Sequence, residues 1–227
     1  MAYLKILLIR HGQSEGNVAG RMEGWSSTGL TTLGQDQAQR LGQRLAGENW
    51  HPTQVYCSPL QRATETLHAM AAGFWETVAI PVPVVFHDDL RENHQGILTG
   101  LTWAEAQAQS PDLCQRLETS LDWIPIPGAE SWAERHQRGQ RFVDTLVQQH
   151  HNGDQVWVIS HQGILQHILA NLLGGERTWG IAWGHTAITE LWLDRDRWFD
   201  TQPNQRLNTE LWKIQRFNDQ TGRALLS

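Results

Sequence analysis

Two histidines follow short apolar segments of the chain, and each is a candidate for chemistry on a phosphoryl group. Arg10 and His11 come directly after the run over residues 3–9, and His161 follows the run over residues 156–159. A neutral imidazole can attack phosphorus without first losing a proton, so His11 is a plausible nucleophile. Because ligands of open α/β sheets bind beyond the strand ends, the repeated pattern predicts two histidines that face one crevice.

Phosphoryl transfer also requires donors for the phosphate oxygens and an acid for the leaving group. Arg10 and Arg62 carry forked N–H donors that suit phosphate, and Asn17 adds an amide donor. Glu92 lies in the loop after a third apolar run and is the natural proton donor. His161, when protonated, supplies a further donor and a positive charge. The chain therefore contains a nucleophile, phosphate donors and an acid at the ends of predicted strands.

The elements that must position these residues alternate along the chain. Apolar runs predict strands over residues 3–9, 54–57, 82–86, 156–159, 186–193 and 211–217. Helical spacing and capping residues predict helices over residues 31–46, 59–70, 102–121, 131–149 and 163–173. This alternation predicts an α/β fold, a three-layer α/β/α sandwich with a mostly parallel central sheet. One domain over residues 1–227 is the economical interpretation of this length.

Composition narrows the classes of partner. The formal net charge is −6, which argues against a broad surface for nucleic acid or anionic lipid. No apolar run approaches the roughly 18 residues of a membrane span, and the first residues do not resemble a secretory signal. We therefore expect a cytoplasmic enzyme with no nucleic-acid or membrane partner, and a homodimer as the default assembly.

The sequence offers little for a metal site. Cys57 and Cys114 are the only cysteines and lack CxxC spacing, so neither zinc nor a disulfide framework is expected. His87, Asp88 and Asp89 have the side-chain types of metal ligands, but adjacent residues rarely reach one ion together. A turn is the better interpretation of that segment.

Four motifs, in this order, resemble the histidine phosphatase superfamily, which includes the cofactor-dependent phosphoglycerate mutases. They are Arg10-His11-Gly12-Gln13-Ser14-Glu15-Gly16-Asn17, Ser58-Pro59-Leu60-Gln61-Arg62-Ala63, Leu90-Arg91-Glu92 and Ser160-His161. The resemblance implies that His11 becomes a phosphohistidine and that Glu92 is the acid and base. It further implies a phosphate-binding set, which consists of Arg10, Asn17, Arg62 and His161. It implies no metal and no cofactor.

The resemblance leaves a choice between phosphatase and mutase. Asn93, Gln95 and Trp103 stand where the mutases of that family typically carry arginine, tyrosine and lysine. The stretch over residues 113–132 lacks the paired arginines expected there and has only Arg116. Without those cations we expect water to take the phosphoryl group. A phosphatase is therefore favoured, and a cofactor-dependent phosphoglycerate mutase is the alternative.

The sequence indicates the type of reaction more clearly than it indicates the substrate. Family analogy suggests small phosphorylated metabolites such as phosphoglycerate, phosphoserine or sugar phosphates. Arg21, Trp25 and His94 are candidate substrate-binding residues around the mouth of the site. His185 stands where relatives often have asparagine, so the sequence leaves that side of the pocket open.

Two rival functions fit parts of the sequence. Residues 12–16 match the GxSxG elbow of serine hydrolases, but that elbow needs an oxyanion-hole loop from an earlier strand, and only eleven residues precede Gly12. A non-catalytic module that binds a phosphorylated ligand is a distant alternative. A pure binder, however, has no use for a nucleophile and an acid together.

Overall fold

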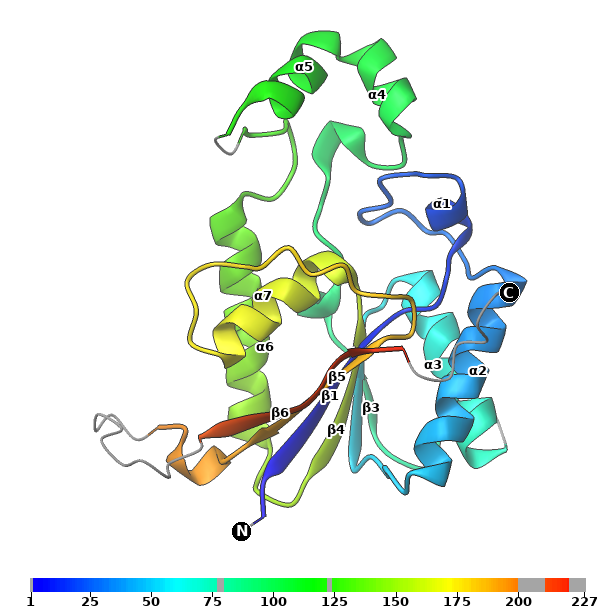
Figure 1. Ribbon diagram of the computed structural model, residues 1–227, viewed down its shortest axis with the longest axis vertical. Helices are drawn as coiled ribbons and strands as arrows, with labels where there is room; N and C mark the ends of the chain where they lie inside the picture. Colours follow the sequence, from blue (N-terminus) through cyan, green and yellow to red (C-terminus); the bar gives the residue numbers. More distant parts are fainter. Residues whose placement is uncertain (1, 77–79, 122–123, 200–210, 221–227) are drawn as a thin grey trace.

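The computed structural model of the protein describes residues 2–76, 80–121, 124–199 and 211–220. At its centre is a six-stranded sheet with the strand order β3-β2-β4-β1-β5-β6 (Figure 1). The strands are β1 (Leu4–Arg10), β2 (Gln54–Cys57), β3 (Val84–Phe86), β4 (Gln155–Ser160), β5 (Ile188–Leu193) and β6 (Trp212–Asp219). β3, β2, β4 and β1 are parallel to one another, whereas β5 is antiparallel to β1 and to β6. The sheet is therefore mostly parallel, as predicted.

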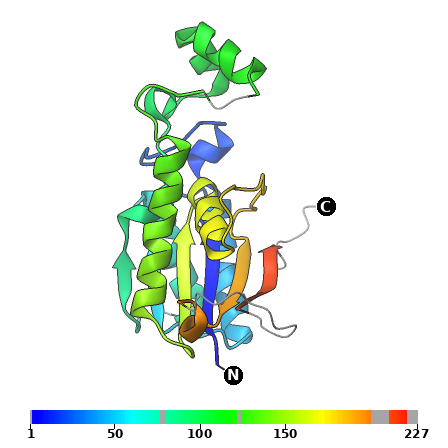
Figure 2. The same cartoon turned by 90° about the vertical axis from the view of Figure 1, so that its left-hand side faces the viewer.

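Helices cover both faces of this sheet (Figures 1 and 2). α2 (Thr32–Gly47) and α3 (Gln61–Trp75) pack on one face, and α6 (Trp132–Gln149) and α7 (Gln162–Leu172) pack on the other. β1 shows why two cores form: Leu4, Ile6 and Leu8 join the core under α6 and α7, whereas Leu7 and Ile9 join the core under α2 and α3. Alternate side chains of a strand point to opposite faces, so a strand buried on both sides reads as a continuous apolar run. The predicted three-layer sandwich is confirmed.

Most predicted elements occur within a few residues of their expected bounds, and the deviations have local causes. The strand predicted over residues 186–193 begins only at Ile188, because Thr186 adopts a left-handed backbone conformation with φ 56°. The helix predicted from Pro59 begins at Gln61 and continues to Trp75. His87 accepts a hydrogen bond from the Asp89 N–H and opens a 3-10 turn over Asp88–Leu90, so this segment is the turn that the sequence predicted.

The helix predicted over residues 102–121 is wrong, because the structure has two helices there. α4 (Trp103–Gln109) and α5 (Pro111–Thr119) meet at Ser110, whose φ of −142° and ψ of 62° are not helical. Proline disfavours the helical conformation of the preceding residue and lacks the N–H that an interior position needs. It is tolerated at the first helical position, which is where Pro111 begins α5.

The α4–α5 pair lies beyond the carboxyl ends of the parallel strands, at the top of Figure 1. It has its own small core, whose fully buried members are Leu98, Ala106 and Cys114. Backbone hydrogen bonds between Met22 and the segment over residues 100–101 attach it to the loop that follows α1 (Glu15–Val18). We call residues 96–119 the cap. Among the described residues, no helix is long and apolar enough to cross a membrane.

Candidate active site

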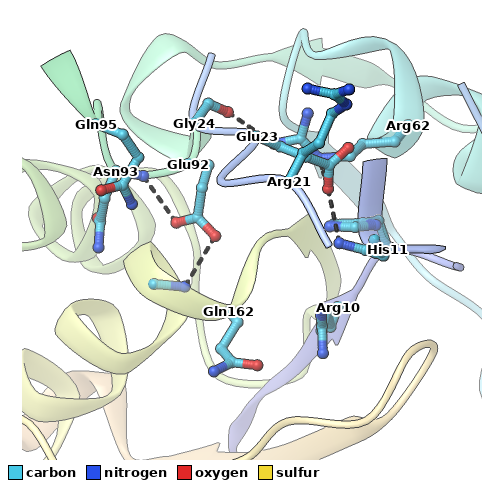
Figure 3. A pocket seen from close by; sticks show the side chains of 12 residues that line it. Arg10, His11, Arg21, Glu23, Gly24, Arg62, Glu92, Asn93, Gln95 and Gln162 are labelled. Carbon is cyan, nitrogen blue, oxygen red and sulfur yellow. Dashed lines mark hydrogen bonds and ion pairs between the residues drawn. The ribbon is translucent and has the colours of Figure 1, made fainter. Parts of the chain in front are cut away.

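The histidines and the phosphate-binding candidates meet at the carboxyl ends of the parallel strands. β1 ends at Arg10, β2 at Cys57 and β4 at Ser160, and the chain continues into His11, Ser58 and His161 at the same edge of the sheet. A cavity of about 290 Å³ opens there (Figure 3). Its lining residues are Arg10, His11, Asn17, Arg21, Glu23, Gly24, Arg62, Glu92, Asn93, Gln95, Gln162 and Gly163.

His11 is held in the form that a nucleophile requires. Its Nδ1 lies 2.7 Å from the carbonyl oxygen of Gly12, so Nδ1–H donates and the Nε2 lone pair stays available. The side chain is buried, and the backbone N–H donates to the Ser160 carbonyl at 2.9 Å. Burial, together with the positive charges of Arg62 and Arg10, holds the pKa of His11 well below its ordinary value. The imidazole is therefore neutral at physiological pH.

His161 lies beside it, with ring centroids 5.0 Å apart. Its Nε2 is 2.7 Å from Ser58 Oγ, and its Nδ1 is buried without a hydrogen-bond partner among the described residues. Burial, then Arg62 and His11, lower the pKa of His161 well below its ordinary value. His161 is thus neutral in the free protein, and the positive charge that the sequence analysis allowed for it is absent there. If the Ser58 hydroxyl donates to Nε2, Nδ1–H is left to donate to a ligand.

Arg62 reaches the cavity from the first turn of α3 and is 1% exposed. Nη1 donates to the Ser26 carbonyl at 3.0 Å and Nη2 to the Gly24 carbonyl at 2.8 Å. Nε lies 3.7 Å from Glu23 Oε2. Burial lowers the pKa of Arg62, and the charges of Glu23 and Glu92 oppose that shift. The guanidinium is therefore a fixed cation with N–H groups left for a phosphate.

Arg10 and His185 occupy another wall of the site. Nη1 of Arg10 donates to the Trp183 carbonyl, which fixes this guanidinium at the end of β1. His185 Nε2 lies 2.9 Å from Asn17 Oδ1, and its ring centroid is 6.3 Å from that of His11. On the side of the pocket that the sequence left open, the imidazole of His185 is therefore hydrogen-bonded to Asn17, a phosphate-binding candidate.

Asn17 is positioned by a capping box at the start of α1. The Asn17 N–H donates to Ser14 Oγ at 3.2 Å, while Asn17 Oδ1 accepts from the Ser14 N–H at 3.3 Å. Its Nδ2 donates to Glu23 Oε2 at 2.7 Å. An amide nitrogen has two hydrogens, so one remains for a phosphate oxygen.

Glu92 faces the cavity from the wall opposite His11 (Figure 3). Its carboxylate accepts three backbone N–H groups, from Asn93 at 2.7 Å, from Gly163 at 3.1 Å and from Ile164 at 3.2 Å. Two of these donors belong to the first turn of α7, where N–H groups have no partner within the helix. The carboxyl group is therefore held in one orientation while it borders the cavity.

Gly163 is the residue that lets Glu92 come this close. A Cβ added at Gly163 would lie 2.3 Å from both Glu92 Oε1 and Asn93 Nδ2, a distance that real Cβ contacts do not show. We expect Gly163→Ala to push the carboxyl group away and to lower kcat about 10²-fold or more, with the fold retained. Steady-state kinetics beside a thermal unfolding curve measure both effects. Gly180→Ala is the matched control, because an added Cβ there meets no atom within 4 Å and activity should be unchanged.

Arg138 of α6 secures the loop that carries Glu92, and sequence reasoning missed it. Nε and Nη2 form a bidentate pair with Glu130, both at 2.8 Å. Nη1 donates to the carbonyls of Asp89 and Arg91 at 2.9 and 2.6 Å, and Nη2 donates to that of Glu92 at 3.2 Å. Arg138 is 5% exposed, so these carbonyls have a buried cation as their partner. It is a positioning residue for the proposed acid.

Replacing Arg138 should therefore cost both stability and rate. Arg138→Met removes the bidentate partner of Glu130 and the Arg138 hydrogen bonds to three loop carbonyls, and breaking such a buried pair costs about 3–5 kcal/mol. We expect a lower midpoint in urea unfolding and a lower kcat. Arg141→Met is the control on the same helix, since Arg141 is half exposed in its pair with Asp89 and loss of such a pair costs about 0–1 kcal/mol. Equal losses in the two variants would contradict the role of Arg138.

Two of the predicted substrate-binding residues pack against each other. The rings of Trp25 and His94 make an edge-on contact with centroids 4.8 Å apart, and the Arg91 guanidinium lies 5.1 Å from the Trp25 centroid. Trp25 Nε1 donates to the Glu92 carbonyl at 2.5 Å. Neither Trp25 nor His94 is among the residues that line the cavity. Their contacts join the loop after α1 to the Glu92 loop.

Arg21, the third of these residues, does line the cavity. Its guanidinium donates to Glu105 of α4 at 2.9 Å and to the Gly100 carbonyl at 2.7 Å. Both partners of the ion pair are about 40% exposed, with values of 39% and 43%. Arg21 therefore attaches the cap to the loop after α1, through a pair that water screens.

The fold and this site together define the class of protein: an α/β domain in which His11, Arg10 and Arg62 line a cavity of about 290 Å³ and the buried His161 lies beside His11. The model of the histidine phosphatase superfamily (branch 1) matches residues 6–205. The chain belongs to this superfamily.

Named relatives favour the phosphatase branch. The chain is 35% identical over 165 residues to the metal-independent phosphoserine phosphatase of Arabidopsis thaliana, covering 72% of this chain and 66% of that protein. It is 36% identical over 141 residues to the 2,3-bisphosphoglycerate-dependent phosphoglycerate mutase of Maricaulis maris (strain MCS10), covering 62% and 57%. The matched regions thus span less than two thirds of either relative.

A solved structure also favours the phosphatase branch. The phosphoserine phosphatase of Entamoeba histolytica, in complex with 3-phosphoglyceric acid, superposes with a TM-score of 0.65 at 26% identity. The match covers 83% of this chain and 90% of that one. These comparisons favour the phosphatase branch of the superfamily.

Proposed function

We propose that this protein is a metal-independent phosphatase that hydrolyses small phosphomonoesters through a phosphohistidine on His11. The observation that carries the proposal is the neutral, buried His11, whose Nδ1 is bound to the Gly12 carbonyl beside Arg10 and Arg62. This arrangement gives a nucleophile that needs no base, next to cations that suit a phosphoryl group. Among the described residues, no group of three or more His, Cys, Asp or Glu side chains is placed to hold a metal ion.

In the first step the Nε2 lone pair of His11 attacks phosphorus, and the bond from phosphorus to the leaving oxygen breaks. The proton of Glu92 passes to that oxygen, so that the product leaves as a neutral alcohol. Arg10 and Arg62 stabilise the equatorial oxygens of the transferring group, an effect for which one lost donor commonly costs about 10²- to 10³-fold in rate. Asn17 and His161 supply further N–H donors.

In the second step water attacks the phosphohistidine from the side that the alcohol has left. Glu92, now a carboxylate, accepts the water proton, and the bond from phosphorus to His11 breaks. Inorganic phosphate is released, and His11 returns to its neutral form. Because the same carboxyl group serves both steps, its fixed place opposite His11 is a requirement of the mechanism (Figure 3).

The cavity favours hydrolysis over transfer to a second phosphorylated molecule. Its cations, among the described lining residues, are Arg10, Arg62 and Arg21, and Arg21 is paired with Glu105. Neutral amides occupy the wall next to Glu92, where Asn93 and Gln95 line the cavity. A second anionic group therefore lacks a dedicated fixed cation. The 36% identity to a phosphoglycerate mutase makes mutase activity the second candidate.

The proposed substrates are phosphoserine, phosphoglycerate and sugar phosphates. A cavity of about 290 Å³ is small enough to select such metabolites over a folded phosphoprotein. The names of the Arabidopsis and Entamoeba relatives support phosphoserine as the first member of a test panel.

We further propose that residues 1–227 act as one domain in the cytoplasm, as a homodimer by default. The net charge of −6 supports the absence of a nucleic-acid partner.

The test is phosphate release in EDTA from phosphoserine, 3-phosphoglycerate and a set of sugar phosphates, with exchange between phosphoglycerate isomers followed in parallel. Phosphate release that persists in EDTA supports the phosphatase. The ester from which phosphate is released fastest identifies its substrate. Isomer exchange without net release would replace it with the mutase. Tight binding with no turnover of any ester would favour a phospholigand-binding module.

A further inference from the structure

A carboxylate that the mechanism does not use lies within the phosphate end of the cavity. Glu23 lines the cavity and is 7% exposed. The Ser14 hydroxyl lies 2.9 Å from both carboxylate oxygens, Asn17 Nδ2 donates at 2.7 Å, and the Thr28 hydroxyl also donates. Gly16 makes room for it, since an added Cβ would lie 2.4 Å from Glu23 Oε1. The local chain is thus built to hold a carboxylate at this place.

The carboxylate lies between two of the phosphate-binding candidates. Its Oε2 accepts the Asn17 amide and lies 3.7 Å from Arg62 Nε. Asn17 is thereby fixed with one amide hydrogen left over, whereas the Nη groups of Arg62 are held by the Gly24 and Ser26 carbonyls. Glu23 therefore orients Asn17 and lies as a counter-charge beside the Arg62 guanidinium.

Glu23 also changes the charge that a phosphate encounters. His11 and His161 are neutral, so the fixed cations at the phosphate end are Arg10 and Arg62. A buried carboxylate beside Arg62 offsets part of that charge, at distances where Coulomb energies inside a protein reach kilocalories per mole. A phosphate dianion consequently binds in a field weaker than the two arginines alone would give.

We infer that Glu23 is a positioning residue that aligns Asn17 and, through its charge beside Arg62, weakens ground-state binding of the phosphate dianion. This inference rests on the proposed phosphatase function. In a loose transition state the transferring group resembles metaphosphate and carries less charge than the dianion. Glu23 therefore repels the bound substrate and the product phosphate more than it repels the transition state. Binding that is weaker only in the ground state raises kcat and speeds release of phosphate.

The experiment is titration calorimetry with inorganic phosphate at about pH 8, where phosphate is mostly the dianion. Glu23→Gln keeps the shape of the side chain, and the two hydroxyls can rotate to suit an amide. We expect it to bind phosphate roughly tenfold more tightly than the wild type. Glu23→Ser removes the same charge with a smaller side chain, so a failure of one variant to fold leaves the other. Glu15→Gln is the control, because Glu15 is an exposed carboxylate two residues from Asn17.

Kinetics give a second readout that a purely structural role would not produce. We expect Glu23→Gln to lower KM and kcat together, because the ground state is stabilised more than the transition state. A side chain that merely held the loop would, when replaced, raise KM and weaken phosphate binding. Unchanged or weaker binding of phosphate in both neutral variants therefore overturns the inference.

The two proposals can fail separately. If the wild type hydrolyses no phosphoester but Glu23→Gln still binds phosphate more tightly, the phosphatase is wrong and the effect of Glu23 on the charge stands. If the wild type hydrolyses phosphoserine but the neutral variants bind phosphate no better, the phosphatase stands and the role of Glu23 is wrong.

Discussion

His11→Ala is expected to lose on the order of 10⁴-fold or more in turnover, the scale seen when a covalent nucleophile is removed. The residual rate would come from Arg10 and Arg62, which still bind and polarise the phosphoryl group. The fold should survive, because the His11 side chain makes only one hydrogen bond among the described residues, to the Gly12 carbonyl. Rapid quenching with radiolabelled substrate provides the direct measurement: an acid-labile phosphoenzyme in the wild type and none in the variant.

The pH dependence of this reaction follows from the lowered pKa of His11. A nucleophile with an ordinary imidazole pKa becomes protonated and inactive below about pH 6.5. Burial and the two arginines hold the pKa of His11 well below that value, so the neutral form persists into the acid range. We expect kcat/KM to show no loss from His11 between about pH 7 and 5.5. For the His11→Ala substitution, the control is His151→Ala, which removes an exposed histidine and should leave the rate unchanged. An unchanged rate in His11→Ala would remove the nucleophile assignment.

Glu92→Gln should produce the second largest loss, and its size should depend on the leaving group. The amide would keep the shape of the side chain but has no proton to give to an alkoxide, so phosphoserine hydrolysis should fall about 10²- to 10⁴-fold. p-Nitrophenolate leaves without a proton, so formation of the phosphohistidine from p-nitrophenyl phosphate should be spared. Single-turnover kinetics on both esters measure the difference. Equal losses on the two esters would assign Glu92 a structural role instead of proton transfer.

Glu92→Gln also requires a control for the hydrogen bonds that the carboxylate makes. Its three backbone N–H partners would face an amide with a single acceptor oxygen, so part of the loss could come from a shifted side chain. Gly163→Ala supplies the comparison, because its added Cβ would displace Glu92 and Asn93 without removing the carboxyl group or its proton. A slow second step in Glu92→Gln, seen as accumulated phosphohistidine, would further separate proton transfer from positioning.

The strand-end placement of the histidines was predictable because it depends on local signals. Parallel strands buried on both faces give unbroken apolar runs, and the two runs that end at Arg10 and Ser160 pair in register in the sheet. Each run therefore puts its following histidine at the same edge. The parallel sheet and its covering helices follow from the same alternation.

The residues that orient the site could not be found in this way. Glu23, Ser58 and Arg138 act through partners that are distant in the sequence or meet only in a folded loop, as with Ser58 and His161 or Arg138 and the Glu92 carbonyl. No periodicity marks such a pair, because each member looks like an ordinary polar residue of a loop or helix. The carboxyl group of Glu23 shows this most clearly, since its four partners come together only when the loop after α1 has folded.

One wrong prediction came from a signal that the sequence does contain. The break at Ser110 was readable from Pro111, but the helical spacing on either side favoured a single helix. Residue type alone placed Trp25 and His94 at the mouth of the site, and their role in substrate binding stays a prediction. Side-chain type cannot distinguish a ring that contacts substrate from a ring that packs on its neighbour, as these two do.

Because the cap has a separate core, amino-acid substitutions in the cap and in the rest of the protein should have different consequences. The phosphate end of the cavity is built on strand ends that the two large cores fix, whereas the cap rests on Leu98, Ala106 and Cys114 and on surface contacts such as Arg21 with Glu105. Mutations in the cap can accumulate without repacking the layers beneath the histidines. No cap residue is among the described residues that line the cavity, but Glu105 contacts the lining residue Arg21, so substitutions in the cap can alter the cavity through that contact.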